Sequence, residues 1–558
     1  MAWSVDTGAM IADSLNSQFE SLAARQGDAV ALIYGEREIA LAELIAEGRR
    51  VASGLAELGI KAGDRVAIWM PNAPAYLALL LACARLGAIC VNVNSRFRST
   101  EVGDIIGRSG ARLLVFWPGY RGIAFSDILA QVDPAVIAGL DAVVSSYATR
   151  DDDNGDDDSD DDDSEAAPPP LPDGVRHLAY DELAAAPPMA EDHGGRDVDF
   201  AIFTTSGTTS APKFVLHRQA SIIDHALDVA PVFGYDQPDA SILLMMPLCG
   251  VFGFSQVMAV LLSGAPLVML PSFDELAAAR AIRRYQVTQC NAGDDMIERL
   301  LAVYDDPVPF PSLRFMCFGA FNSPPEVTAA RGAERGLTLC SVYGMSEVQA
   351  LYALPPPEWP LAERSKAGGR LISPRAEVRV RDTESGALLP AGETGELELK
   401  GPSLMHEYFN NPEATKKGLT EDGFVRTGDL GYLLEGGGFV FLTRMGDVIR
   451  LGGFLVSPLE IEAVVEAHPS VSAVQVVAVE HEGRNRPIAF VIAKAGSGES
   501  FDEETVYGFC RGRIAKFKVP ERFFPIGEFP ATTGPNGTKI QKGKLRQMAL
   551  ERLQGGAV

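Results

Sequence analysis

The sequence predicts an α/β protein with a large N-terminal domain of helix-covered sheets and a small α+β C-terminal domain. The chain has 558 residues, which is too long for one hydrophobic core and favours at least two domains. Amphipathic helices and short apolar strands alternate along much of it, a pattern typical of parallel sheets covered by helices. From residue 449 onward a helix and two strands follow one another closely, which indicates a compact α+β unit.

The first elements follow from hydrophobic spacing. Residues 41–59, LAELIAEGRRVASGLAELG, carry apolar side chains at helical spacing and predict an amphipathic helix. Residues 64–70 (DRVAIWM) and 88–94 (AICVNVN) predict strands, and residues 75–87 (AYLALLLACARLG) predict a mostly apolar helix between them. Residues 200–207 (FAIFTTSG) predict a strand that runs into a polar loop.

Residues 242–273 contain no charged side chain and are long enough to span a bilayer. Proline and glycine at Pro247, Gly250 and Gly264 divide the stretch into short pieces. We therefore expect a strand, a buried helix from about Phe254 to Leu262 and a second strand, and no membrane span. The stretches VAPVFGYDQPDASILLMMP and LRFMCFGA are interpreted as further strand ends.

The C-terminal part predicts a helix at residues 458–469 and strands at residues 473–481 and 483–494. The expected division is a large domain at 1–443, a hinge at 444–448 and a mobile C-terminal domain at 449–558. Residues 151–173 interrupt the large domain with an acidic run followed by prolines, which predicts a disordered insertion.

Charge and cysteine content limit the classes of molecule that this protein is expected to bind. The formal net charge of −25 argues against nucleic acid as a partner, although a local basic site can still bind an anionic substrate. The seven cysteines are scattered without a C-x2-C pair, which gives no zinc signal and fits a reducing compartment. The first residues show no secretory signal, so a cytoplasmic protein is expected.

The most distinctive motif is TTSGTTSAPK, at residues 204–213. Backbone N–H groups, small hydroxyls and one ammonium together suit phosphate oxygens. A polar surface turn is the alternative, because glycine, serine, threonine and proline are the usual turn residues.

Two further motifs follow expected strands. SVYGMSE, at residues 341–347, brings a carboxylate to the end of a strand, where ligands sit in open α/β sheets. This carboxylate could bind Mg²⁺. The alternative is that the serine and glutamate cap a helix. GFVRTGDLGYL, at residues 423–433, places an aspartate that could accept hydrogen bonds from ribose hydroxyls; an Asp-Gly type turn is the alternative.

The last two motifs lie near or beyond the expected domain boundary. TRMGDVIRLGGFLVSPLEIE, at residues 443–462, combines an arginine that can reach a nucleotide with a glycine suited to a hinge. GPNGTKIQKGKLR, at residues 534–546, carries a lysine on a glycine-rich loop; a solvated lysine on an Asn-Gly hairpin is the alternative.

Taken together, in this order and spacing, the motifs resemble those of the adenylate-forming superfamily: acyl-CoA synthetases, adenylation domains of peptide synthetases and firefly-type luciferases. Residues 63–94, 395–415 (GELELKGPSLMHEYFNNPEAT) and 515–520 (AKFKVP) add to the resemblance, which covers nearly the whole chain. It implies an acyl-CoA synthetase-like fold with a mobile C-terminal domain.

The resemblance also implies site residues. The phosphate loop would comprise Thr205, Ser206, Gly207, Thr208, Thr209 and Lys213. The adenine and ribose contacts would comprise Gly319, Ala320, Phe321, Tyr343, Gly344, Met345, Asp429 and Arg444. The catalytic set would be Lys539, Glu347 and Ser346, with Glu347 as the Mg²⁺ ligand. Gly446 would be the hinge, and Gly452 and Gly453 would border the pantetheine passage.

Departures from the family pattern concern the loop and the acyl pocket. Ser210 and Phe214 replace glycines of the loop, while Lys213 keeps its place, so ATP binding is expected to survive. Thr538 intervenes between Gly537 and Lys539, where the family lysine usually follows glycine directly.

The expected substrate pocket comprises Cys249, Gly250, Phe254 and Asp294. Gly250 stands where many relatives carry histidine or another large residue. Asp294 and Asp295 replace an apolar segment, and they would either meet a cationic or hydroxylated substrate or cap the following helix.

The resemblance implies ATP-dependent activation of a small-molecule carboxylic acid to acyl-AMP, followed by thioester formation with coenzyme A. ATP, Mg²⁺ and coenzyme A are the implied cofactors. Delivery of the acyl group to a carrier protein and nucleotide binding without turnover stay open as alternatives. The identity of the acid is open, and so is the oligomeric state, with a homodimer as one option.

Overall fold

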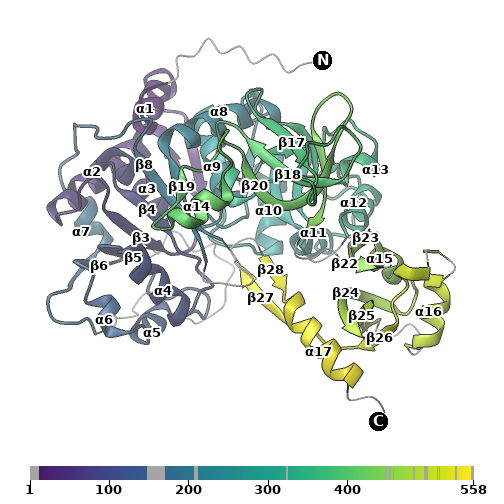
Figure 1. Cartoon of the computed structure of the whole chain (residues 1–558). Helices are drawn as coiled ribbons and strands as arrows, with labels where there is room; N and C mark the ends of the chain where they lie inside the picture. Colours follow the sequence, from purple (N-terminus) through teal and green to yellow (C-terminus); the bar gives the residue numbers. More distant parts are fainter. Residues whose placement is uncertain are drawn as a thin grey trace.

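The computed structural model describes residues 12–146, 170–205, 212–321, 324–445, 449–451, 454–456, 458–481, 484–494, 501–511, 513–514, 516–534 and 537–554. The expected insertion falls mainly on residues outside these ranges, as do most of the phosphate loop and part of the hinge. Two large sheets with their helices form the main body, and the segment from residue 449 onward lies at one side of it (Figure 1).

An eight-stranded sheet contains the first predicted strands. Its order is β19-β9-β8-β4-β3-β5-β6-β7, and it is parallel from β8 to β7. Ile68 packs on one face of β3 and Trp69 on the other, so the central strands are buried on both faces. The strands are β19 Glu407–Tyr408, β9 Phe214–Arg218, β8 Asp199–Thr204, β4 Ile89–Asn92, β3 Arg65–Trp69, β5 Leu113–Phe116, β6 Ala142–Ser145 and β7 Arg176–Ala179.

A seven-stranded sheet has the order β14-β13-β12-β10-β11-β1-β2 and is parallel except for the β1–β2 hairpin. Its strands are β14 Leu339–Ser341, β13 Phe315–Gly319, β12 Gln289–Gly293, β10 Ile242–Leu244, β11 Leu267–Met269, β1 Val30–Tyr34 and β2 Arg37–Ala40. The uncharged stretch therefore forms strand, helix and strand as predicted, although its helix, α9 (Val251–Ser263), begins about one turn earlier than expected. Of the residues read as strand ends at 229–247, the first belong to helix α8 (Gln219–Phe233), so that expectation was wrong there.

The largest hydrophobic core lies between these two sheets. It combines side chains of both sheets with those of α2, α3, α8 and α9. The predicted helices at residues 41–59 and 75–87 are confirmed as α2 (Leu41–Glu57) and α3 (Pro74–Leu86). From Tyr76 onward every residue of α3 is buried, which explains why the sequence of this helix is almost entirely apolar.

A six-stranded antiparallel sheet, which the sequence analysis did not predict, follows the parallel sheets along the chain. Its order is β15-β16-β21-β20-β18-β17. The strands are β15 Ala353–Leu354, β16 Gly368–Leu371, β21 Phe439–Arg444, β20 Val425–Leu433, β18 Gly395–Lys400 and β17 Glu377–Arg381.

The C-terminal part is α+β, as predicted. A three-stranded sheet, β24-β25-β26, packs with helices, and two hairpins, β22–β23 and β27–β28, accompany it. Its buried apolar residues cluster among themselves. The strands are β22 Ile449–Leu451, β23 Phe454–Val456, β24 Val471–His481, β25 Arg484–Ala493, β26 Arg522–Pro525, β27 Ala531–Gly534 and β28 Gly537–Ile540.

The remaining helices cover the sheets and the C-terminal unit. They are α1 Leu15–Gln26, α4 Ser99–Ser109, α5 Phe125–Ala130, α6 Pro134–Ile137, α7 Tyr180–Ala184, α10 Glu275–Arg284, α11 Asp294–Leu301, α12 Pro325–Glu334, α13 Leu361–Arg364, α14 Pro412–Gly418, α15 Pro458–Glu466, α16 Glu503–Arg511 and α17 Lys542–Gln554, with 3₁₀ turns at η3 Ser346–Val348 and η4 Lys516–Lys518.

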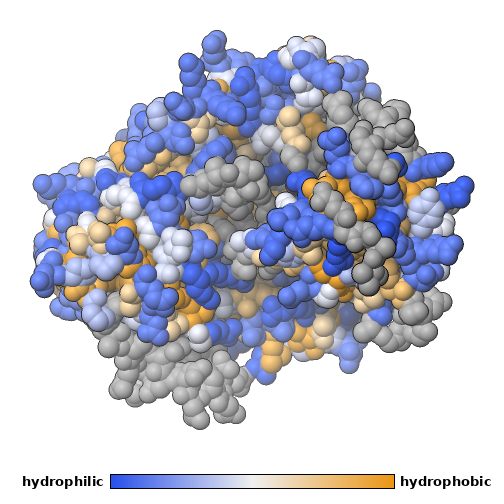
Figure 2. Space-filling model, turned by 60° about the horizontal axis from the view of Figure 1, so that its bottom comes forward, coloured by the Kyte–Doolittle hydropathy of each residue, from blue (hydrophilic) through white to orange (hydrophobic). Residues whose placement is uncertain are grey.

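The molecular surface is mainly hydrophilic on the face drawn in Figure 2, where hydrophobic residues occur in smaller areas between polar ones. Among the described residues no helix is both long and apolar enough to cross a membrane. All seven cysteines are buried, and none forms a disulfide.

Candidate active site

The two ends of the phosphate loop are held together by hydrogen bonds. Strand β8 leads into the loop and β9 leaves it, and the two strands pair antiparallel. The Thr205 N–H donates to the Lys213 carbonyl at 3.0 Å, and the Lys213 N–H donates to Thr205 Oγ1 at 3.2 Å. The loop residues Ser206, Gly207, Thr208 and Thr209 lie outside the described residues, so the structure fixes only the base of the loop.

From this base a chain of contacts leads to Glu347. The exposed ammonium of Lys213 lies 4.4 Å from the ring centroid of Tyr408, within range of a cation–π interaction. The Tyr408 hydroxyl donates to Glu347 Oε1 at 2.7 Å. Burial, followed by the neighbouring Glu347 carboxylate, raises the pKa of Tyr408, so the hydroxyl stays protonated and donates at neutral pH.

Two buried histidines hold the segment that carries Glu347. His217 on β9 donates from Nε2 to the Ser346 carbonyl at 2.8 Å, and His225 on α8 donates from Nε2 to the Ala350 carbonyl at 2.6 Å. Burial lowers the pKa of both histidines to about 4, so both are neutral donors at neutral pH. The side chain of Gln349 in turn donates to the Ser221 carbonyl at 2.7 Å.

Tyr343, Asp429 and Arg444 lie together. The Tyr343 hydroxyl donates to Asp429 Oδ2 at 2.7 Å, and Arg444 Nε lies 3.4 Å from Asp429 Oδ1. Asp429 and Arg444 are direct partners in the register of β20 and β21. Burial, followed by the Asp429 carboxylate, raises the pKa of Tyr343. The structure therefore brings together three residues from three sequence motifs.

Gly344 lies between Tyr343 and the Glu347 segment and has a clear packing reason to be glycine. A Cβ atom placed on it would lie 2.7 Å from the Ala350 Cα and 2.8 Å from the Leu351 nitrogen. Met345 is partly buried and its sulfur lies 3.9 Å from the Tyr343 hydroxyl.

The segment after β13 carries the expected adenine contacts. Gly319 ends the strand, and Ala320 and Phe321 are exposed. A Cβ on Gly319 would lie 2.6 Å from the Phe321 ring, so the ring folds back over this glycine. The Phe321 N–H donates to Asp294 Oδ2 at 3.1 Å.

Asp294 therefore does not act as a simple helix cap. It is the first residue of α11, Gly293 is the cap, and the carboxylate accepts hydrogen bonds from the backbone N–H groups of Phe321 and Asp295. Of the two alternatives, capping is met in part, because the carboxylate accepts from the first-turn N–H of Asp295 while it also reaches the segment after β13. Its role in the substrate pocket stays a prediction.

The other expected pocket residues lie on or just before α9. Gly250 is its N-cap, and Cys249 is buried, which raises the pKa of its thiol to about 11 and keeps it uncharged. Phe254 is fully buried, with its ring centroid 5.0 Å from that of Phe203 on β8.

The C-terminal candidates are only partly described. Lys539 lies on β28, opposite Thr532 of β27, so the lysine is carried by a hairpin rather than by an irregular loop. The hairpin lies on the side of the C-terminal part that faces the main body (Figure 1). The Lys539 side chain lies outside the described residues, and so do Gly446, Gly452 and Gly453.

A magnesium site at Glu347 fits the donor set. Within the described ranges there is no group of three or more histidine, cysteine or carboxylate side chains that could hold a metal. Mg²⁺ in nucleotide sites usually takes one or two carboxylates and completes its shell with phosphates and water. A single buried carboxylate near a phosphate loop is therefore compatible with the ion.

The sequence analysis missed Tyr408, His217 and His225. Tyr408 lies within the stretch used for the resemblance, but only the fold shows that its hydroxyl contacts Glu347. The histidines carry no motif signal, since they act through backbone carbonyls more than a hundred residues away.

Known proteins match this chain over nearly its whole length. The sequence model described as AMP-binding enzyme matches residues 19–409, and the one described as AMP-binding enzyme C-terminal domain matches residues 460–534. The 2-succinylbenzoate–CoA ligase of Geobacillus kaustophilus (strain HTA426) is 31% identical over 94% of this chain and 95% of its own. The mitochondrial medium-chain acyl-CoA ligase ACSF2 of Mus musculus is 28% identical over 94% of this chain and 86% of its own.

Solved structures agree with these matches. ATP-bound MatB from Rhodopseudomonas palustris has a TM-score of 0.79 and 26% identity, covering 96% of this chain and 99% of its own. The anthranilate CoA ligase AuaEII shares the fold, with a TM-score of 0.81. It is 21% identical to this chain, and the match covers 98% of this chain and 99% of its own. Given the extent of the first sequence match and the fold it shares, the chain belongs to the AMP-binding enzyme family.

Proposed function

We propose that this protein is an AMP-forming acyl-CoA synthetase, which activates a carboxylic acid with ATP and transfers the acyl group to coenzyme A. The observation that carries the proposal is the family match across both parts of the chain, together with the acyl-CoA ligase relatives. The contacts among Lys213, Tyr408 and Glu347, and between Tyr343 and Asp429, support a nucleotide site.

In the first half-reaction an oxygen of the substrate carboxylate forms a bond to the α-phosphorus of ATP. The bond from that phosphorus to the bridging oxygen breaks, and pyrophosphate leaves. Charge accumulates on the phosphoryl oxygens, so binding and electrostatic stabilisation provide most of the catalysis. Mg²⁺ held by Glu347 would neutralise part of this charge.

The protein groups have separate tasks in this step. Lys213 would bind the β- and γ-phosphates with its ammonium. The buried Asp429 carboxylate would accept hydrogen bonds from the ribose hydroxyls, with Tyr343 and Arg444 fixing its orientation. Lys539 would come in from the hairpin to stabilise the developing charge at the α-phosphate.

In the second half-reaction the sulfur of coenzyme A bonds to the acyl carbonyl carbon, AMP leaves with the electron pair of the C–O bond, and the thiol proton is released. Lys539 and the thiol need the same space at different times. A rotation of the C-terminal domain about the 444–448 segment would therefore exchange Lys539 for the segment that carries Gly452 and Gly453.

The test is a panel of carboxylic acids assayed with ATP and Mg²⁺, with and without coenzyme A. Medium-chain aliphatic and aryl acids come first, followed by hydroxy and amino acids. Pyrophosphate release with coenzyme A-dependent formation of AMP and a thioester is the expected result. Adenylation with no effect of coenzyme A would point to another acceptor, such as a carrier protein, and no pyrophosphate release from any acid would contradict the proposal.

A further inference from the structure

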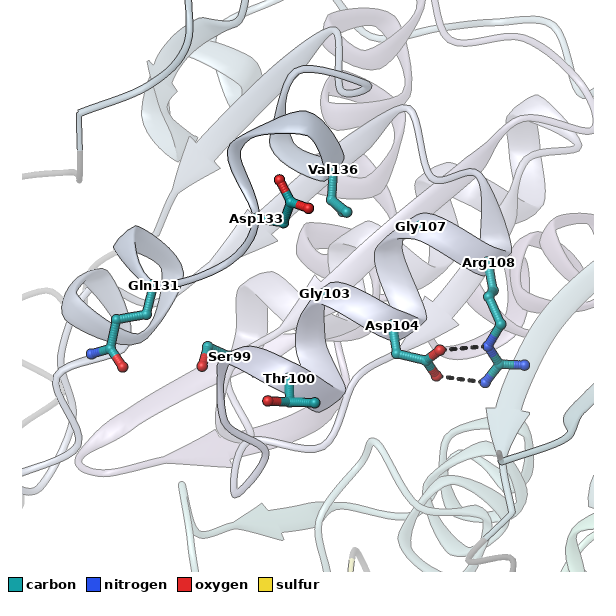
Figure 3. Close-up of a pocket in the computed structure, with 9 residues that line it drawn as sticks. All are labelled: Ser99, Thr100, Gly103, Asp104, Gly107, Arg108, Gln131, Asp133 and Val136. Atoms are coloured by element: carbon teal, nitrogen blue, oxygen red, sulfur yellow. Dashed lines mark hydrogen bonds and ion pairs between the residues drawn. The ribbon is translucent and has the colours of Figure 1, made fainter. Parts of the chain in front are cut away.

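An arginine on helix α4 contacts the end of the phosphate loop. Arg108 donates from Nε and Nη2 to the two carboxylate oxygens of Asp104, at 2.8 and 2.6 Å (Figure 3). The same Nη2 donates to the Pro212 carbonyl at 2.9 Å. The guanidinium carbon also lies 4.3 Å from the ring centroid of Phe214.

An exposed ion pair one helical turn apart contributes little by itself, so the contacts beyond α4 matter most. Phe214 stands where the family loop usually has glycine, and its side chain is buried in the core on the outer face of the eight-stranded sheet. The ring therefore offers a fixed surface to a planar guanidinium, which lysine could not match. Asp104 restrains the position of the guanidinium through two hydrogen bonds.

The peptide between Pro212 and Lys213 is consequently held on both sides. Arg108 donates to its carbonyl oxygen, and its N–H donates to Thr205 Oγ1 at 3.2 Å. A peptide plane fixed in this way sets the direction in which the Lys213 side chain leaves the backbone. That side chain ends over Tyr408, which in turn donates to Glu347.

We propose that Arg108, supported by Asp104 and Phe214, is a positioning residue for Lys213 and so sets the affinity of the enzyme for the triphosphate of its nucleotide. The inference rests on the proposed function, because it takes Lys213 as a phosphate ligand.

The position of Arg108 on the surface allows its contact with the loop to be tested without disturbing the hydrophobic core. With Asp104 it lines a surface groove of about 470 Å³ between α4 and α6, and its side chain is partly exposed (Figure 3). Replacing it removes no core side chain, so Arg108→Ala should fold normally. The chain also offers a matched control. Arg284 on α10 donates to both carboxylate oxygens of Glu36 and lies against the Tyr285 ring, and among the described residues it does not contact either end of the phosphate loop.

The experiment measures KM for ATP, KM for the acid and kcat, together with calorimetric binding of ATP and Mg²⁺ and the melting temperature. Arg108→Ala should weaken ATP binding and raise its KM about tenfold, while KM for the acid and the melting temperature stay near the wild-type values. Arg108→Lys should be intermediate, and Arg284→Ala should match wild type. Adding Asp104→Asn to Arg108→Ala should cause little further loss, because the two act as one unit.

Unchanged ATP affinity in Arg108→Ala would overturn the proposal, and so would equal losses for ATP and acid accompanied by a lower melting temperature. Wild-type protein that binds ATP but forms no thioester would instead overturn the proposed function. Calorimetry would still test Arg108 in that case, because it needs no turnover.

Discussion

Protonation of His217 should weaken the fold around the candidate site in mildly acidic solution. The ring is fully buried and donates to the Ser346 carbonyl, and burial lowers its pKa to about 4. In the unfolded chain the pKa of histidine is about 6.5. Between these values the unfolded chain binds a proton that the folded protein does not, so stability is fully present above about pH 6.5 and falls as the pH falls towards 4.

The size of the effect follows from the linkage relation. A shift of this kind removes about 2 kcal/mol of unfolding free energy per histidine between pH 7 and pH 4.5. The variant His217→Gln keeps an amide donor for the Ser346 carbonyl but does not titrate. We expect it to be less stable than wild type at pH 7, by about 1 kcal/mol, and to lose about 2 kcal/mol less than wild type on acidification.

Denaturant unfolding followed by tryptophan fluorescence measures this difference. The four tryptophans, at positions 3, 69, 117 and 359, all precede residue 444, so the signal reports on the large N-terminal part. His193→Gln serves as the control, because it makes the same substitution at an exposed position. If His217→Gln lost as much stability as wild type between pH 7 and pH 4.5, the argument from burial would be refuted.

Three further substitutions test the site. Tyr408→Phe removes a hydrogen bond to the buried Glu347 carboxylate, which is worth about 1.5–3 kcal/mol. The variant should raise KM for ATP, because Glu347 is then held less firmly. An unchanged KM would contradict a role for the contact between Tyr408 and Glu347. Asp429→Asn should abolish the preference for ATP over a 2′,3′-dideoxy analogue, measured by competition, and a preserved preference would remove the ribose role. Lys539→Ala should slow acyl-AMP formation on the order of 10²-fold. The same variant should still form the thioester from supplied acyl-AMP. Equal loss of both steps would contradict the role of Lys539 in adenylation.

Local periodicity was sufficient to predict the parallel part of the fold. The apolar spacing at residues 41–59 reappears as α2, and the alternation of strand and helix reappears as two mainly parallel sheets. The uncharged stretch at residues 242–273 was divided correctly because proline and glycine restrict backbone geometry wherever they occur. The family resemblance is confirmed as well, since several short motifs at fixed spacing are far more specific than any one of them.

The antiparallel sheet could not be predicted in the same way. Its strands β15 and β16 are short, and β16 pairs with β21, some seventy residues later in the chain. Which two strands pair depends on which strands the rest of the fold brings close together. The β-propensity of each short segment carries little information about its pairing partner. The same limit applies to the site: Tyr408 lies 61 residues from Glu347, and His217 lies 129 residues from Ser346.

The segment after Glu347 shows why these distant contacts matter. Gln349 and Leu351 have positive φ angles of 55° and 67°, a conformation that costs non-glycine residues about 1 kcal/mol or more each. Both residues are almost completely buried, and two hydrogen bonds offset the strain: His225 donates to the Ala350 carbonyl, and the Gln349 side chain donates to the Ser221 carbonyl. A strained segment persists only where its surroundings hold it, and strain of this kind gathers at functional sites. Weakening the histidine contacts should therefore disturb Glu347 before it unfolds the domain.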